Sequence, residues 1–527
     1  MNSGRDGGDE AARSPLLEGK EAAGGWLNKL IDVAEAKAQM AFALPMILTN
    51  AAYYFIPLVS VMFAGHLGEL ELAGSNLANS WAAVTGFSLM VGLSGSLETL
   101  CGQGFGAKMY RMMGVYLQTS CILSIIFTVA ISVLWWYSDF VLTLLHQEPQ
   151  IANSAGLYLK YLIPGLFAYG LLQNMLRFLQ TQSVVMPLVV CSIVPLVLHI
   201  GITYALVHWS SLGYRGAPFA ASISLWISAF MLGSYLLRAK EFERTWDGFT
   251  LESLSHVFTN LKLALPSAAM VCLEYWAFEI LVLLAGLMPN SEITTSLIAM
   301  CVNTEAIAYM IAYGLSAAAS TRVSNELGAG NPDRARHATG VTLRLTVALS
   351  LVVVLALCFG HKLWASAFSN STVIINAFAS MTPFLVVSIV CDFVQGILSG
   401  VARGCGWQHL VVFINLGTFY LIGMVVAAIL GFKTELHAKG LWMGLICGLA
   451  AQTMGLFVLS KLTNWKRIEL SQEDSCAKTN INVQPELQYL DLITLTGADD
   501  LDSELNVGFE VILTKNDLNL AKTPWIL

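Results

Sequence analysis

Long hydrophobic runs, separated by short polar segments, repeat along most of the chain. A helix needs about 20 mostly apolar residues to cross a lipid bilayer, and twelve of the runs reach that length. The pattern therefore predicts twelve membrane-spanning helices. The expected spans are residues 40–64, 72–100, 115–136, 155–181, 185–207, 217–237, 260–288, 296–320, 338–360, 373–402, 410–431 and 438–461.

The composition supports a membrane protein and excludes several soluble classes. Of the 527 residues, 56% are hydrophobic and 12% are charged, whereas soluble domains carry about 25% charged residues. The net charge of −7 disfavours a nucleic-acid partner. Phosphate-binding loops and the usual zinc motifs are absent from the sequence. We therefore expect a protein that is not an enzyme and binds neither a cofactor nor a metal.

The basic residues near the spans predict the orientation, because Lys and Arg are enriched in cytoplasmic loops. With a cytoplasmic N-terminus, twelve basic residues fall in cytoplasmic loops and five in the opposite loops. Arg177 and Arg403 are counted among the twelve. The count predicts that both termini are cytoplasmic. Residues 1–37 are predicted to form a disordered cytoplasmic tail, and residues 462–527 an acidic one.

Short sequence matches indicate an internal repeat. Ala43-Leu44-Pro45 recurs as Ala264-Leu265-Pro266, and Gly106-Ala107 recurs as Gly328-Ala329, at offsets of 221 and 222 residues. Two halves of six spans each enter the membrane in the same sense, so a pseudo-twofold axis along the membrane normal relates them. The predicted fold is an all-α, polytopic membrane protein with two six-helix lobes. The predicted domains are an N-terminal lobe (residues 38–237), an inter-lobe linker (residues 238–259) and a C-terminal lobe (residues 260–461).

Five acidic residues lie within the predicted spans: Glu98, Glu274, Glu279, Glu305 and Asp392. A carboxylate at the bilayer centre costs about 2.5–3.5 kcal/mol on insertion scales, so each suggests a function. A buried carboxyl group can bind a proton on one side of the membrane and release it on the other. The alternative is that such acids bond to neighbouring polar groups and hold helices together. We assign Glu274, Asp392, Glu279 and Glu305 as candidate proton-coupling residues, and favour a structural role for Glu98.

Aromatic and amide side chains near these acids are candidates for a substrate cavity. Glu274 and Glu279 are five residues apart and project about 140° apart on a helix, so both cannot face one cavity squarely. Ring faces beside Glu274 are suited to stacking on flat organic cations, although packing residues have the same composition. The candidate cavity residues are Tyr275, Trp276, Asn303, Tyr309, Gln395 and Asn415.

Four longer motifs resemble those of a known family. They are the runs of residues 61–68, 98–107, 272–276 and 322–332, which read VMFAGHLG, ETLCGQGFGA, CLEYW and RVSNELGAGNP. These motifs are similar to those of the multidrug and toxic compound extrusion (MATE) transporters in their plant form. The resemblance covers roughly residues 35–465 and excludes both tails.

The resemblance implies an antiporter with two lobes around a V-shaped central cleft. Organic solutes such as xenobiotics, alkaloids or other secondary metabolites would leave the cytosol in exchange for protons. Glu274 and Asp392 match the coupling acids of the family, and Glu279 matches the second glutamate of its organic-cation subgroup. Transport of flavonoid conjugates or organic anions into the vacuole, sodium coupling and an anion channel are the alternatives. We expect a monomer in the vacuolar or plasma membrane, with the solute, the proton (or sodium) and the lipid bilayer as partners.

Overall fold

The computed structural model describes residues 32–463 and 465, except residues 247, 289–290 and 369–370. Most of the predicted N-terminal tail and nearly all of the C-terminal tail lie outside this range. The described residues form helices and turns and contain no β-strand. Among these described residues, twelve helical segments are long and apolar enough to cross a membrane. This confirms the predicted fold class.

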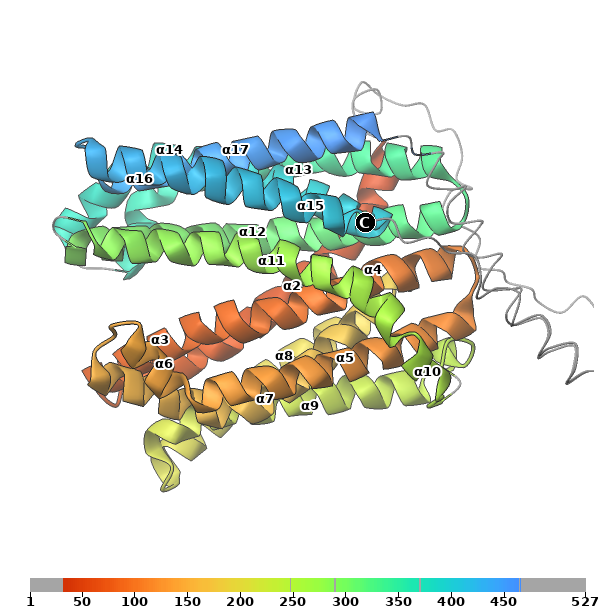
Figure 1. The fold of residues 1–527 in the computed structure, drawn as a ribbon, viewed down its shortest axis with the longest axis horizontal. Coiled ribbons are helices and arrows are strands. Elements are labelled where there is room, and N and C mark those ends of the chain that lie inside the picture. Colours follow the sequence, from red (N-terminus) through yellow and green to blue (C-terminus); the bar gives the residue numbers. More distant parts are fainter. Residues whose placement is uncertain (1–31, 247, 289–290, 369–370, 464, 466–527) are drawn as a thin grey trace, which may run out of the picture. The chain divides into compact units, whose positions relative to one another are not determined.

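The first six spans form the N-terminal lobe, which lies in the lower half of Figure 1. Two spans are continuous helices with a short π-helical segment, which often marks a functional region. The short helix α6 (Ser138–Leu144) was not predicted. The elements of the spans are α2 (Val33–Gly65); α3 (Glu69–Ala82), η1 (Ala83–Phe87) and α4 (Ser88–Gly106); α5 (Tyr110–Trp136); α7 (Pro149–Thr181); α8 (Met186–Tyr204) and η2 (Ala205–Trp209); and η3 (Gly213–Arg215) and α9 (Gly216–Arg238).

The remaining six spans form the C-terminal lobe, in the upper half of Figure 1. The connection between the lobes contains η4 (Lys240–Phe242) and α10 (Glu252–Ser255). The elements of the second lobe are α11 (Val257–Gly286); α12 (Ser291–Gly328); α13 (Pro332–Phe368); α14 (Thr372–Cys405); α15 (Gln408–Asn415), η5 (Leu416–Gly423) and α16 (Met424–Lys433); and α17 (Ala438–Leu462).

Each lobe has its own hydrophobic core. Trp135, Tyr158 and Phe178 are fully buried in the first core, and Phe378 and Trp442 are fully buried in the second. Within a bilayer, close van der Waals packing of such side chains and interhelical hydrogen bonds, rather than removal from water, stabilise each group of helices. Two separate cores are the arrangement expected when two repeated halves move relative to one another.

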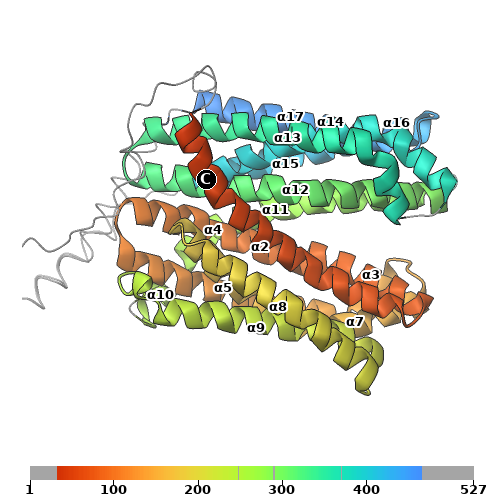
Figure 2. The same ribbon diagram turned by 180° about the vertical axis from the view of Figure 1, so that it is seen from behind.

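Helix α2 contacts both lobes and runs obliquely across them in Figure 2. The Asp32 side chain caps its first turn, because it accepts hydrogen bonds from the backbone N–H groups two and three residues later. Near this end Glu35 pairs with Arg322 of α12 at 3.1 Å. At the other end Ser60 donates to the Ala217 carbonyl oxygen of α9. The helix begins at Val33, within the range that the sequence assigns to the N-terminal tail.

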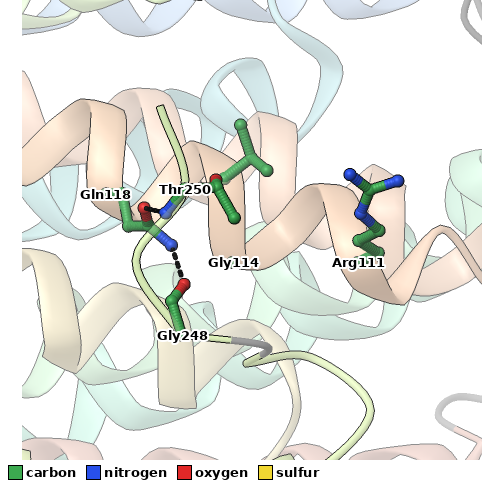
Figure 3. A pocket seen from close by; sticks show the side chains of 6 residues that line it. Arg111, Gly114, Gln118, Gly248 and Thr250 are labelled. Atoms are coloured by element: carbon green, nitrogen blue, oxygen red, sulfur yellow. Dashed lines mark hydrogen bonds between the residues drawn. The ribbon is translucent and has the colours of Figure 1, made fainter. Parts of the chain in front are cut away.

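The inter-lobe linker is held against α5 of the N-terminal lobe. Figure 3 shows Gln118, whose amide donates a 2.6 Å hydrogen bond to the Gly248 carbonyl oxygen. The same amide accepts one of 2.9 Å from the Thr250 N–H. Arg111 and Glu252 form an exposed ion pair nearby. The cavity between these residues measures about 10 Å³, which suffices for about one water molecule and excludes an organic solute.

The two lobes meet at the last turns of α4 and α12, which we call the closed end. A methyl group on Gly106 would overlap the Asn325 carbonyl oxygen, and one on Gly328 would overlap that of Gln103. Gly106 and Gly328 come from the repeated Gly-Ala motif and are 222 positions apart, and Gln103 and Asn325 are separated by the same number of positions. The contact is therefore reciprocal, as a pseudo-twofold axis requires. These glycines are needed because the backbones approach too closely for any side chain.

Candidate functional site

Two carboxyl groups of the C-terminal lobe share one amide. Gln395 Nε2 donates hydrogen bonds of 2.8 Å to Glu274 Oε1 of α11 and to Asp392 Oδ1 of α14. Asp392 and Gln395 lie one turn apart on the same helix face, and both are buried, whereas Glu274 is half-buried. Ser399, one turn further, donates to Gln395 Oε1 at 3.1 Å. This bond orients the amide so that its nitrogen faces both acids.

Glu305 lies beside this pair. Ser388 Oγ, one turn before Asp392 on α14, donates a 2.7 Å hydrogen bond to Glu305 Oε2 of α12. Ser388 also accepts a 3.1 Å hydrogen bond from Trp442 Nε1 of α17. Glu305 Oε1 is buried and has no hydrogen-bond partner among the described residues. Glu274, Asp392 and Glu305, together with Gln395 and Ser388, are called the acid cluster below.

Glu279 is separate from the acid cluster. Its carboxyl oxygens accept hydrogen bonds of 3.0 and 3.2 Å from Ser80 Oγ of α3, in the other lobe. Trp276 of the same helix donates to the Val84 carbonyl oxygen at 3.0 Å. Glu274 therefore bonds within its own lobe and Glu279 bonds to the opposite one, as the angle of about 140° between them predicts.

The candidate cavity residues fall into three groups. Gln395 and Tyr309 belong with the acid cluster, since Tyr309 packs against Gly396, the residue after Gln395. Tyr275 and Trp276 are 40% and 42% exposed on α11, directly after Glu274. Asn303 is exposed on α12. Asn415 is fully buried and joins α15 to the Met270 carbonyl oxygen of α11 and to Gln452 of α17.

A second group of buried charges was missed by the sequence reasoning. Glu98 Oε1 lies 2.9 Å from Arg177 Nη1 of α7, and Glu98 Oε2 lies 3.0 Å from Arg403 Nε of α14. All three side chains are buried. The expectation that Arg177 and Arg403 belong to loops is therefore wrong, which leaves ten basic residues against five for the predicted orientation. The sequence did contain a signal for this cluster. Arg177 lies inside a predicted span, where an arginine needs a counter-charge, and Glu98 lies in another predicted span.

These features define a class of protein. Twelve apolar helices in two repeat-related lobes, with ionisable groups buried between them, are the architecture of secondary transporters. The MatE family model matches residues 45–205 and 266–429, one match in each lobe, and the chain belongs to this family of MATE membrane transporters. It is a multi-pass membrane protein, as predicted.

Known plant proteins are similar over most of the chain. Protein DETOXIFICATION 18 of Arabidopsis thaliana is 60% identical over 450 residues, covering 85% of this chain and 96% of that relative. The crystal structure of the eukaryotic MATE transporter AtDTX14 is 37% identical with a TM-score of 0.81, covering 84% of this chain and 99% of that one. An outward-facing MATE transporter of the MOP superfamily is 18% identical with a TM-score of 0.73, which supports the fold alone.

Proposed function

We propose that this protein exports organic solutes from the cytosol in exchange for protons, and that Glu274 and Asp392 couple the two fluxes. The observation that carries the proposal is the single Gln395 amide shared between carboxyl groups of two different helices. A small shift of α11 against α14 changes the distance between these two groups. Their protonation is therefore linked to the arrangement of the helices that hold them.

Proton binding and solute binding compete at this pair. Two ionised carboxylates held close together in an interior of low dielectric constant repel one another, and such pairs titrate as a coupled unit. Either a proton or an organic cation relieves the repulsion. The ionised pair therefore binds the solute, and protonation releases it. Each pH unit across the membrane supplies about 1.4 kcal/mol per proton, so a two-unit gradient sustains about hundredfold accumulation of an uncharged solute.

The surroundings of Glu274 favour amphipathic aromatic solutes. Tyr275 and Trp276 follow it on α11 and expose two-fifths of their surface, which leaves ring faces available for stacking on a flat cation. Glu279 adds a second acid less than two turns along the same helix. This arrangement supports alkaloids or other cationic metabolites as substrates.

The orientation of the Gln395 amide favours the proton over sodium. A sodium ion prefers several oxygen ligands, but here the amide nitrogen faces Glu274 and Asp392. The amide oxygen is occupied by the Ser399 hydroxyl. An N–H donor between the two acids is compatible with a site that exchanges protons, and it occupies the position in which a sodium ion would need oxygen ligands.

Transport in proteoliposomes tests the proposal. Vesicles containing the purified protein are preloaded with a fluorescent organic cation, and either a proton gradient or a sodium gradient is imposed. We expect the proton gradient alone to drive release of the cation. Release driven only by sodium would refute proton coupling while preserving antiport. If neither gradient moves the cation, the export of organic cations is refuted, and organic anions become the substrates to test.

A further inference from the structure

The three buried charges at the closed end connect the two lobes. Glu98 lies on α4, and Arg177 lies on α7 of the same lobe at 2.9 Å. Arg403 approaches the carboxylate from α14 of the other lobe, at 3.0 Å. Glu98, Arg177 and Arg403 together are called the inter-lobe ion cluster. None of them belongs to the acid cluster.

Glu98 lies where the two repeats meet. Ser320 Oγ donates a 2.5 Å hydrogen bond to Glu98 Oε2, and these residues are 222 positions apart. The same offset relates Gly106 to Gly328, so Glu98 and Ser320 occupy equivalent positions beside the pseudo-twofold axis. Each lobe then contributes one arginine to this central carboxylate. The surrounding hydrogen bonds are also reciprocal, from Gln103 to the Gly404 oxygen and from Asn325 to the Thr181 oxygen.

The charges in this cluster do not cancel. One carboxylate faces two guanidinium groups, and Arg177 Nε has no hydrogen-bond partner among the described residues. Arg177 Nη2 also donates to the Tyr313 hydroxyl of α12, and the guanidinium carbon lies 5.4 Å from the centre of the Tyr313 ring. Burial removes the hydration of all three charges, so separating one of them from the cluster is strongly unfavourable unless water or another charge replaces the lost partner. Such a contact is suited to a protein with two conformations, one in which the contact is formed and one in which it is broken.

A polar face of α14 links the inter-lobe ion cluster to the acid cluster. Asp392, Gln395, Ser399 and Arg403 are spaced three or four residues apart, which places them on one side of the helix. Arg403 Nη2 donates to Ser316 Oγ of α12 at 3.0 Å, and Ser316 donates to the Gly396 carbonyl oxygen beside Gln395. Helix α14 therefore carries Asp392, one of the two proposed proton-coupling acids, as well as Arg403, which contacts the other lobe.

We propose that the inter-lobe ion cluster keeps the closed end shut, and that the Glu98–Arg403 contact separates whenever this end opens. Glu98 and Arg177 belong to one lobe and stay together as a neutral pair. Arg403 and Tyr313 leave with the other lobe. Opening therefore leaves an unpaired positive charge on α14, three turns from Asp392, and ionised acids stabilise it there. This last step rests on the proposed proton coupling, but the separation itself does not.

The reactivity of a single cysteine measures the opening directly. Ser324 is fully buried at the closed end, directly against Gly102, so Ser324→Cys reports when this end becomes accessible. Its rate of reaction with a water-soluble maleimide is measured in nanodiscs, without solute or gradient. Failure of the proton-coupling proposal therefore leaves this test intact. For each variant, the reaction of the same variant without Ser324→Cys is subtracted, because the chain has ten native cysteines.

The test variant is Arg403→Gln, which leaves Glu98 and Arg177 as a neutral pair. We expect its reporter to react about tenfold faster, because the inter-lobe ion pair is lost. The matched control is Arg111→Gln, which breaks the exposed pair with Glu252 and leaves the rate unchanged. Glu98→Gln provides a second variant. In the double variant with Arg403→Gln, we expect the increase in reporter rate to be smaller than the product of the two single increases. A reporter rate in monodisperse Arg403→Gln protein equal to that of the parent would overturn the proposal.

Discussion

Asp392→Asn and Glu274→Gln are each expected to abolish solute accumulation driven by a proton gradient. Both changes keep the side-chain shape and remove the exchangeable proton. Gln395 donates to both groups at 2.8 Å, and an amide oxygen accepts such a bond as a carboxyl oxygen does. The fold is therefore retained while the coupling is lost. Under a two-unit gradient the accumulation ratio should fall from about a hundredfold to near one.

Uptake of a fluorescent organic cation into proteoliposomes provides the measurement. Asp139→Asn and Glu252→Gln are matched controls, because these acids form partly exposed pairs with Lys160 and Arg111. Both controls should accumulate solute normally. Exchange of labelled for unlabelled solute without a gradient should persist in the variants of Asp392 and Glu274, which shows that they still bind and move it. Driven accumulation that survives in both variants would contradict their role in coupling.

Gln395→Leu is expected to lower driven transport by at least about tenfold, although it removes no charge. The amide is fully buried and is the donor shared by the two acids. Leucine leaves both carboxyl groups without this partner, and an unsatisfied buried polar group costs about 1–3 kcal/mol, more when it is charged. The variant therefore loses the hydrogen bonds that stabilise the two acids in their ionised form.

Ser399→Ala is the graded comparison for Gln395→Leu. It removes only the 3.1 Å bond that orients the amide oxygen, so we expect a reduction of a few-fold. Initial rates are measured across a series of pH values, because a loss of folded protein lowers the whole profile, whereas a change in the acid pair moves its midpoint. An unshifted pH profile in Gln395→Leu would mean that the amide only fills space between α11 and α14.

Local features of the sequence predicted the spans and the repeat, and they placed Gln395 among the candidate site residues. Twelve apolar runs are visible without any tertiary information, and Asp392 and Gln395 meet because one helical turn separates them. The start of α2 at Val33 was also within reach, since Asp32 and Glu35 form the beginning of a helix-capping pattern. The assigned range of the N-terminal tail overlooked that signal.

Contacts between distant residues could not be predicted in this way. Arg177 and Glu98 are 79 positions apart, and Arg403 and Glu98 are 305 apart. An arginine near the end of a span is usually attributed to a loop, and only the packing of four helices shows that these two are buried. The bond from Ser80 to Glu279 depends in the same way on how the two lobes meet.

The competition between proton and solute at Glu274 and Asp392 is tested most directly by proton release on binding. Purified protein in weakly buffered detergent solution is titrated with an organic cation while a pH indicator records protons set free, between about pH 5 and pH 8. We predict release that approaches about one proton per bound solute below the midpoint of the acid pair and falls to zero above it, and none in Asp392→Asn. Binding of the solute without proton release at any pH would contradict the mechanism.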